Sequence, residues 1–535
     1  MIFEIAPGLA VLVPLATAFV LPGLGLFTGR RTTQVASVLA MTLTFLMTIL
    51  TFINVTELGQ HIQLYRLGGY APPIGIVLEI DYLNALVGLL LGFLLFLLAI
   101  FSVGYMSQDT GQQYYYILLL TMSAGFVGCV YTGDLFNLFV FLEIASISSY
   151  GLVAFRKDYR ESFEGAFKYL VVSALALNMY YFATTILYNT YGTLNMADLA
   201  AKIHGELGST LTGVSDPLGL TKNPGVTAVL VLALSIWAFS IKGSIAPLHF
   251  PHVDAAQVAP STISAMFSGI MTAVAFYVIM RFTVTLYGGA TTIGNVGNMI
   301  LTLLMIMGLA SMVIGSLLTL VQDDLKRLLA FSTVANAGYV VFGIGMLAFE
   351  QWPLSSRGLI PLEAAVLHLV NHTIVKVLLF LCAGGILFAT GRRKIDELGG
   401  LGKKMPFLAI CYSIGALAIV GVPTLNCFVS KWLLIVAAVN KATALYYVFA
   451  VVIVATSAIM LVAQLRVIYG ISAGVTRIEM RTDKLPLTMV IPIAALTILT
   501  VILGLYPQLI LSNVEDAAKA MVNPDYWKYV WRLFT

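Results

Sequence analysis

The sequence predicts an all-α protein that crosses a membrane many times. Of its 535 residues, 59% are hydrophobic and only 10% are charged, and the mean hydropathy is +0.95. Soluble domains usually carry about 25% charged residues, so a deficit of this size over such a length is typical of polytopic membrane proteins. Apolar segments of roughly 20 residues, the length that spans a bilayer as a helix, recur along the whole chain.

We expect about fourteen transmembrane helices from the length that a bilayer requires. The candidate spans are residues 6–28, 34–54, 81–105, 113–131, 134–154, 166–188, 225–246, 260–283, 297–320, 328–349, 360–390, 407–438, 444–470 and 486–506. Residues 56–80 are rich in Gly, Pro and β-forming residues, and we expect them to form an extramembrane hairpin. Residues 507–535 suit a helix at the membrane interface. Their aromatic and basic residues include Tyr526, Trp527, Lys528, Tyr529, Trp531 and Arg532.

The distribution of Lys and Arg predicts the orientation. If the N-terminus faces outside, the inside loops hold most of the basic residues that lie outside the spans. Because positive residues gather on the cytoplasmic side, both termini are expected outside the cell membrane. The first segment, whose early charge is Glu4, is expected to remain as a helix because it lacks the positive n-region of a signal peptide.

Four charged residues interrupt the apolar spans: Glu143, Lys242, Lys376 and Lys431. A charge at the middle of a membrane helix costs at least about 2.5–3.5 kcal/mol. Such residues usually face a bundle interior or water and take part in ion pathways. These four residues are therefore candidates for an ion pathway.

The run HLVNHTIVK adds two titratable groups to the helix that carries Lys376. His368, His372 and Lys376 are spaced by four residues, which places them on one face of one helix. Because the unperturbed pKa of histidine is about 6.5, this stripe predicts a path for protons.

Structural roles compete with this interpretation. A buried histidine is often a hydrogen-bonded core residue, and Glu143 can be a structural partner for a lysine. Asp134, near the end of a span, is expected to be a cap or an interfacial group. A metal site at His249 and His252 is disfavoured because no thiolate or carboxylate motif joins them. The four cysteines lie far apart, so we expect no metal or cofactor on this chain.

Two spans are broken near a lysine. Pro247 and Pro251 follow Lys242, and the segment 421–423 (GVP) interrupts the span that carries Lys431. The freed backbone groups of a broken helix are tolerated where they line a cavity or the protein interior. Two such breaks favour two inverted five-helix repeats, a layout found in transporters. The expected units are residues 1–105, 113–283 (first repeat), 297–470 (second repeat) and 486–535 (last span and interfacial helix).

Several motifs together resemble one family. They are GDLFNLFVFLE (133–143), EGAFKYL (164–170), YGTLNMADLA (191–200), Lys242 with PLH (247–249), DAAQVAPSTIS (254–264), DDLKRLLAFSTVANAGY (323–339), HLVNHTIVKVLLFLCAGG (368–385) and GVPTLNCFVSKW (421–432). In this order they resemble the antiporter-like subunits shared by respiratory complex I, Mrp-type Na⁺/H⁺ antiporters and membrane-bound hydrogenases.

The resemblance implies fourteen helices, two inverted five-helix repeats and a line of charged residues along the membrane midplane. It implies that Glu143 is the glutamate of the fifth helix and Lys242 the lysine of the broken seventh helix. The stripe from His368 to Lys376 matches the eleventh helix, and Lys431 matches the terminal residue of the broken twelfth. Candidate accessory residues are Lys168, His249 and Asp134.

The sequence departs from the family pattern at two places. Ala273 stands where many members carry a lysine, and HFPHVDAA (249–256) stands where the pattern is H-x-W-L-P-D-A-H. Both departures put a continuous proton path in doubt. Only a short segment follows the last span, which disfavours the complex I member that carries a long lateral helix. The chain looks closest to the Mrp-D or hydrogenase-type group.

We therefore expect a subunit that moves H⁺ and/or Na⁺ within a multisubunit membrane complex. Its expected partners are other membrane subunits and the lipid bilayer, with a hydrogenase-type or ferredoxin-linked peripheral arm as one option and no nucleic acid. No redox or catalytic centre is expected on this chain. One alternative is a proton-pumping subunit of a complex I-like NADH/quinone oxidoreductase. Another is a passive scaffold, which would tolerate neutral replacement of Lys242 and Glu143.

Overall fold

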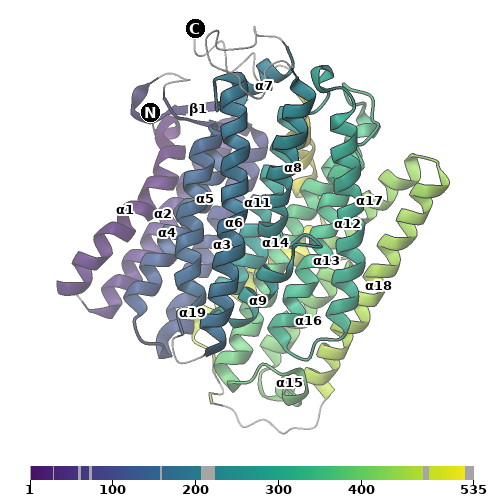
Figure 1. The fold of residues 1–535 in the computed structure, drawn as a ribbon. Coiled ribbons are helices and arrows are strands. Elements are labelled where there is room, and N and C mark those ends of the chain that lie inside the picture. Colours follow the sequence, from purple (N-terminus) through teal and green to yellow (C-terminus); the bar gives the residue numbers. More distant parts are fainter. Residues whose placement is uncertain are drawn as a thin grey trace.

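The described part of the chain is a bundle of helices. The computed structural model describes residues 2–27, 29–57, 62–70, 75–156, 160–205, 223–473, 481–482 and 484–523. In this part, the long helices run side by side between two ends of the molecule (Figure 1). Thirteen of the described helices are long and apolar enough to cross a membrane, which confirms an all-α, multi-pass membrane protein.

Twelve of these spans are uninterrupted α-helices. They are α1 (Ile2–Phe27), α2 (Arg30–Thr56), α3 (Tyr82–Tyr105), α4 (Gln112–Tyr131), α5 (Leu135–Val153), α6 (Arg160–Tyr191), α8 (Pro224–Lys242), α12 (Val296–Leu320), α13 (Leu325–Gly345), α14 (Ser356–Thr390), α18 (Ala444–Ala473) and α19 (Leu487–Leu505). The thirteenth, Ser261–Leu286, joins α10 (Ser261–Ala265), η4 (Met266–Met271), α11 (Thr272–Met280) and η5 (Arg281–Leu286). Of these segments, η4 and η5 are π-helical.

Two helices are broken where the sequence predicts breaks. After α8 ends at Lys242, the chain continues as the short helix α9 (Phe250–Val258). Helix α16 (Pro406–Val420) is followed, after a turn, by α17 (Asn426–Asn440). The turn begins at Gly421, whose φ of +93° is a conformation that glycine adopts without strain. If α16 and α17 are two halves of one span, the total is the expected fourteen.

Two of the helices begin with the same cap at opposite ends of the bundle. Asp134 accepts a hydrogen bond from the Asn137 backbone N–H at 2.8 Å and caps α5, and Asp324 accepts one from the Arg327 N–H at 3.1 Å and caps α13. Asp134 lies near α7 (Met196–Ile203), whereas Asp324 lies near the segment before α15 (Leu401–Lys404), at the other end (Figure 1). Caps at opposite ends are the arrangement that the expected inverted repeats predict for α5 and α13.

Short elements cover the two ends. The segment 56–80 contains the antiparallel strands β1 (Gln63–Arg66) and β2 (Val77–Ile80). The remaining short helices are η1 (Leu67–Gly69), η2 (Met106–Gln108), η6 (Thr291–Ile293), η7 (Ile395–Glu397) and α15 (Leu401–Lys404). Near the C-terminus, α20 (Gln508–Val522) packs against α3 and α14. The aromatic residues of the expected interfacial helix, Tyr526 to Trp531, lie outside the described residues.

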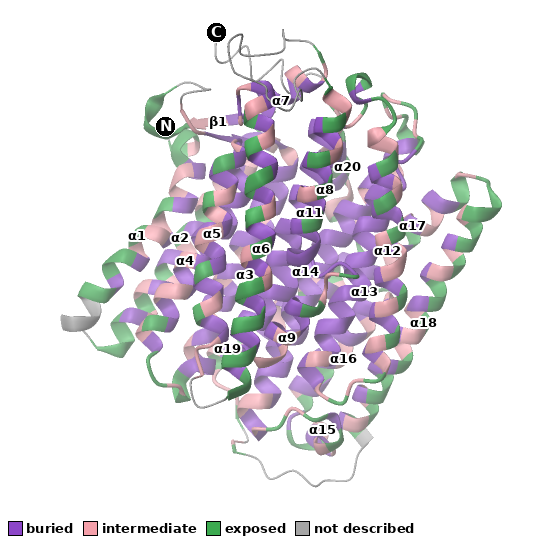
Figure 2. Cartoon of the chain, in the orientation of Figure 1, coloured by how far each residue is buried: buried purple, intermediate pink, exposed green. Residues whose placement is uncertain are grey.

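The core lies along the middle of the bundle. Figure 2 shows α13 and α14 largely buried, whereas α1, α2 and α18 carry exposed residues along their outer sides. The span Ser261–Leu286 is buried along its whole apolar stretch. Helix α14, which carries the predicted stripe, therefore runs through the interior and not along the lipid-facing surface.

A buried ion pair joins the N-terminal helices to the Ser261–Leu286 span. Arg281 Nη2 lies 2.6 Å from Asp81 Oδ1, and both side chains are almost completely buried. The same arginine bonds Asn84, and Asp81 also caps α3. Removing one partner of a buried pair typically costs about 3–5 kcal/mol, so this contact fixes how α3 packs against the Ser261–Leu286 span.

Candidate functional site

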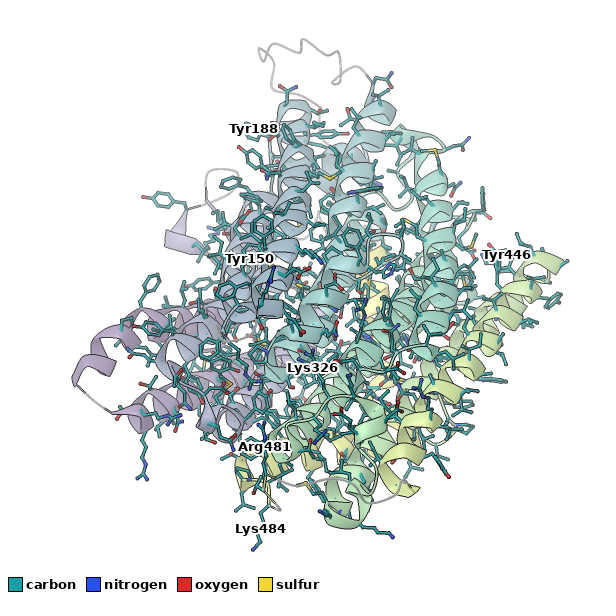
Figure 3. The ribbon with its side chains drawn as sticks, turned by 60° about the horizontal axis from the view of Figure 1, so that its bottom comes forward. Tyr150, Tyr188, Lys326, Tyr446, Arg481 and Lys484 are labelled. Carbon is teal, nitrogen blue, oxygen red and sulfur yellow. The ribbon has the colours of Figure 1, made fainter. Side chains whose placement is uncertain are left out.

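Lys242 stands at the end of the first half of a broken helix, and only 3% of the residue is exposed. Its ammonium donates hydrogen bonds to Ser146 Oγ of α5, at 2.7 Å, and to Ser173 Oγ of α6. Tyr150, labelled in Figure 3, donates to the same Ser173 Oγ at 2.9 Å. The ring centroid of Tyr169 lies 5.5 Å from Nζ, within the range of a cation–π interaction. The helix break thus places a lysine between two hydroxyl groups and an aromatic face.

Glu143 is not a direct ion-pair partner of Lys242 in the described part of the chain. The carboxylate is half-buried and interacts with Lys242 electrostatically, but it has no hydrogen-bond or ion-pair partner within the described part of the chain. Helix geometry explains this. On α5, Ser146 faces Lys242 and Ile147 points outward, with 63% of the residue exposed. Glu143 projects from the helix in a direction between those of Ser146 and Ile147. The serines take the place of the expected carboxylate.

The histidine–lysine stripe of α14 is buried over its whole length. His368, His372 and Lys376 are each 0% exposed. Lys376 Nζ donates to the Leu329 carbonyl oxygen at 2.8 Å and to the Ser332 hydroxyl, both on α13. The rings of His368 and His372 are nearly parallel, with centroids 6.3 Å apart. The three side chains therefore face the interior, as their spacing predicts.

The stripe ends beside Lys431. His368 Nδ1 shares a hydrogen bond of 2.8 Å with Ser430 Oγ, whose neighbour in α17 is Lys431. The ring of Tyr339 lies 5.3 Å from the His368 ring and 4.2 Å from Lys431 Nζ. The packing of α13, α14 and α17 brings together residues that are far apart in the sequence.

The break between α16 and α17 provides the hydrogen-bond acceptors that surround Lys431. Its ammonium donates to the carbonyl oxygens of Ile419, at 3.2 Å, and Val420, at 2.8 Å, and to Ser457 Oγ at 3.2 Å. The two carbonyls end α16, where backbone acceptors lack helical partners and the helix dipole is negative. A Cβ at Gly421 would lie 2.9 Å from Lys431 Cδ, so the glycine also makes room for this side chain.

Every buried lysine of the described helices is held by neutral oxygen atoms. This group comprises Lys242, Lys326, Lys376 and Lys431, and Lys326 bonds the Ala259 carbonyl. Within the described ranges, none of the four has a carboxylate at ion-pair distance. A lysine bound only to hydroxyls and carbonyls can release its proton without leaving a carboxylate unpaired. This arrangement suits proton transfer better than a structural salt bridge does.

The three accessory candidates lie outside this buried line. Asp134 is the N-cap of α5. Lys168 is exposed, pairs with Glu164 at 2.7 Å and lines a surface cavity of about 250 Å³. His249 is half-buried, and its ring meets the edge of Phe331 with centroids 6.1 Å apart.

Sequence reasoning misses most of the partners of the lysines. The acceptors Ser146, Ser173, Ser332 and Ser457 are short polar residues in apolar helices, and nothing in the pattern singles them out. The expected span 328–349 leaves Lys326 outside, but the residue lies buried in the first turn of α13.

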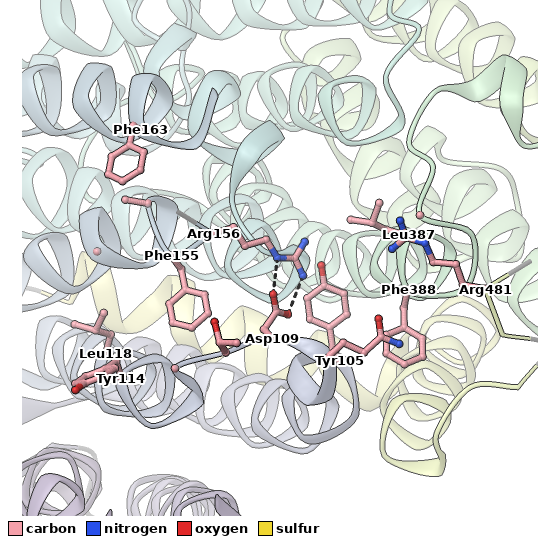
Figure 4. Close-up of a pocket in the computed structure, with 16 residues that line it drawn as sticks. Tyr105, Asp109, Tyr114, Leu118, Phe155, Arg156, Phe163, Leu387, Phe388 and Arg481 are labelled. Carbon is pink, nitrogen blue, oxygen red and sulfur yellow. Dashed lines mark hydrogen bonds and ion pairs between the residues drawn. The ribbon is translucent and has the colours of Figure 1, made fainter. Parts of the chain in front are cut away.

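A larger cavity, of about 670 Å³, lies apart from the buried lysines. Its lining includes Tyr105, Phe155 and Phe388, together with Arg481 and the ion pair between Arg156 and Asp109 (Figure 4). The lining contains none of the intramembrane lysines or histidines, so this surface hollow is not the ion-pathway site.

The comparisons with known proteins agree with this architecture. A family model described as NADH:quinone oxidoreductase/Mrp antiporter, TM, matches residues 132–460. The chain is 32% identical over 472 residues to the N subunit of the NADH-quinone oxidoreductase of Desulforudis audaxviator, a match that covers 85% of this chain and 87% of that protein. It is 31% identical over 523 residues to the D subunit of the Na⁺/H⁺ antiporter of Alkalihalophilus pseudofirmus. This match covers 97% of this chain and 98% of that protein.

A solved structure shows the same fold. A chain of the membrane-bound sulfane sulfur reductase, described as an archaeal respiratory membrane complex, superposes with a TM-score of 0.84 at 27% identity. The superposition covers 98% of this chain and 99% of the other. The family model spans more than half of the sequence and includes both broken helices and the buried lysines. The chain therefore belongs to the NADH:quinone oxidoreductase/Mrp antiporter transmembrane family.

Proposed function

We propose that this chain is a proton-translocating subunit of a multisubunit membrane complex, either a Mrp-type cation/proton antiporter or a hydrogenase-type respiratory complex. The observation that carries the proposal is the line of buried lysines and histidines, in which each lysine is held by neutral acceptors. Intramembrane ionisable residues in such surroundings commonly belong to ion and proton pathways. A passive scaffold gives no reason to bury Lys242, Lys376 and Lys431 with no carboxylate of the described ranges at ion-pair distance.

Protons fit these surroundings better than sodium ions. In transporters with broken helices, unwound carbonyls and the C-terminal ends of half-helices coordinate Na⁺ or H⁺. Here the ammonium of Lys431 donates hydrogen bonds to the carbonyl oxygens at the C-terminal end of α16. Its positive charge opposes a second cation at the same place. If the complex moves Na⁺, we place the Na⁺ path on another subunit.

Neighbouring membrane subunits are the expected partners. The outer side of α5 exposes Phe136, Val140 and Ile147, and Glu143 lies at the edge of this apolar face. A carboxylate at a lipid-facing position is costly. A second subunit that covers this face would complete the surroundings of Glu143, and its own charges could pair with the carboxylate.

The end of the bundle that carries α15 is proposed to face the cytoplasm. It gathers Arg156, Arg393, Lys403, Arg466 and Arg481, and Figure 3 shows Arg481 and Lys484 at this end. Positive residues favour the cytoplasmic side. Both termini would then lie outside the cell membrane, as the charge distribution of the sequence predicts.

Purification of the intact complex in mild detergent tests this function. Mass spectrometry of the co-purified subunits should find either small antiporter subunits or a redox arm, including a ferredoxin-linked or NADH-linked one. In liposomes, the complex should change the internal pH when its driving gradient or reaction is supplied. A fully active chain that moves ions alone, or a complex that moves no protons, would contradict the proposal.

A further inference from the structure

His252 is a buried histidine that the pathway described above does not use. It lies on α9, it is 0% exposed, and its Nε2 shares a hydrogen bond of 3.2 Å with Ser268 Oγ. Ser268 belongs to the π-helical segment η4, and π-helical turns inside α-helices are frequent at functional sites. His252 therefore joins the second half of the first broken helix to the centre of the Ser261–Leu286 span.

The stripe of α14 lies close enough to interact with this ring. His252 interacts electrostatically with Lys376 and with His372. Helix α9 packs against α13, the helix whose Leu329 and Ser332 hold Lys376. His252 is thus a neighbour of the stripe although it comes from the other repeat.

On its other side, two aromatic rings separate His252 from Lys242. The ring of Phe267 lies 6.2 Å from the ring of His252 and 5.1 Å from the ring of Tyr169. Tyr169 is the residue whose face contacts Lys242. These contacts place His252 between the stripe and the Lys242 side of the bundle.

The ring nitrogens of His252 and His372 need partners. His252 Nδ1 and both nitrogens of His372 are buried and have no hydrogen-bond partner within the ranges that the structure describes. Leaving a buried polar atom unpaired costs about 1–3 kcal/mol. For this reason almost all buried polar atoms in proteins bond to protein groups or to ordered water. A bridging water between these two rings would satisfy a nitrogen of each and would connect them for proton transfer.

We propose that His252 is a proton-relay residue that connects the α14 stripe to the Lys242 side of the bundle; this inference rests on the proposed function. The ammonium of Lys376, or protonated His372, gives one proton through water to Nδ1 of neutral His252. The donor becomes a neutral amine or imidazole, and His252 becomes an imidazolium. Nε2 then gives its proton to the Ser268 hydroxyl, which passes its own proton to water on the Lys242 side, and the ring is left neutral with its proton on Nδ1. Exchange with water, which takes the Nδ1 proton and returns one to Nε2, restores the first tautomer with no net transfer of charge. The reverse order carries a proton the other way.

Three variants of the complete complex in liposomes test the relay. His252→Gln keeps an amide that can bond Ser268 but cannot carry a proton, and it should lower proton transport by about tenfold or more. His252→Lys can carry a proton without the ring, and it should transport more than the glutamine variant. His204→Gln, the same change at the C-cap of α7, is the matched control and should transport normally. Lys376→Met serves as the reference for the proposed function.

The outcomes separate the relay from the proposed function. Normal transport by assembled His252→Gln, or equal loss in the Gln and Lys variants, overturns the relay. Loss in Lys376→Met with normal transport in His252→Gln leaves the proposed function standing and removes only the relay. If the His252 variants do not assemble, a high-resolution map of the wild-type complex decides. Ordered water between His252 Nδ1 and His372 supports the relay, and dry apolar packing around Nδ1 overturns it.

Discussion

Replacing Lys376 by methionine removes a buried positive charge and should leave the fold almost intact. Methionine has a similar length and flexibility, so it fills most of the space of the lysine stem. The two acceptors that the ammonium leaves behind keep other hydrogen bonds. The Leu329 carbonyl still accepts from Ser332 Oγ at 2.9 Å and from Thr333 Oγ1 at 3.2 Å, and Ser332 remains the donor of the first of these bonds.

The expected stability change follows from this geometry. Because no buried donor or acceptor is left unpaired, the variant avoids the roughly 1–3 kcal/mol that each orphaned group would cost. Replacing a buried ionic group by an apolar one of similar volume is often neutral or stabilising. We therefore expect Lys376→Met to change the free energy of unfolding by no more than about 1 kcal/mol. Proton transport should nevertheless fall by about 100-fold, because methionine carries no proton.

The assay compares assembly and transport in the same preparations. Thermal unfolding and the yield of the complete complex report stability, and a pH-sensitive dye inside liposomes reports proton transport. Transport close to that of the wild type would refute the role of Lys376 in the pathway. A large loss of Tm or of assembly would refute the reasoning about its hydrogen-bond partners.

Substitutions at four further residues probe the other parts of the pathway. Glu143→Gln should lose most coupled transport while Glu143→Asp keeps some, both with normal assembly; a glutamine variant with normal dye response in liposomes would remove Glu143 from the mechanism. Gly421→Ala should lower both Tm and transport, since a side chain at positive φ costs roughly 1–2 kcal/mol and its Cβ would crowd Lys431. Unchanged thermal unfolding and transport would show that the break tolerates a side chain. Combined Ser146→Ala and Ser173→Ala should reduce transport more than either change alone, and a double variant that transports normally would reduce the two hydroxyls to packing groups.

The positions of the intramembrane lysines can be predicted because a charge stands out against an apolar span. Lys242, Lys376 and Lys431 each lie within such a span, and all three are buried. The two helix breaks are also predictable, since glycine and proline disrupt helical backbone geometry directly. These features are local, and local chemistry is what a single sequence displays.

The partners of the lysines depend on how helices pack, and the sequence does not display this. Ser146 and Ser148 lie two residues apart in one helix, yet Ser146 accepts from Lys242 whereas Ser148 donates to the Ile144 carbonyl of its own helix. Back-bonding of the second kind is common for serine in helices, so neither residue stands out. The same limit applies to Glu143, whose direction is set by the rotation of α5 against α8.

Charges near the ends of spans are hard to assign for a related reason. The expected span 328–349 leaves Lys326 just outside, and Arg281 lies two residues before the end of the expected span 260–283, so the sequence indicates no partner for either residue. The structure buries Lys326 against the Ala259 carbonyl and Arg281 against Asp81, which is distant in the sequence. Only tertiary contacts decide whether a charge at the end of a helix meets solvent or a partner.

The most direct test of the central claim is proton transport by the complete complex carrying Lys242→Met. The claim is that the buried lysines carry protons, and the hydrogen bonds that Lys242 donates go to two serine hydroxyl groups. With equal amounts of assembled wild-type and variant complex in liposomes, we predict that the variant loses nearly all proton transport driven by the complex. Transport equal to that of the wild type would contradict the claim and would favour a passive scaffold.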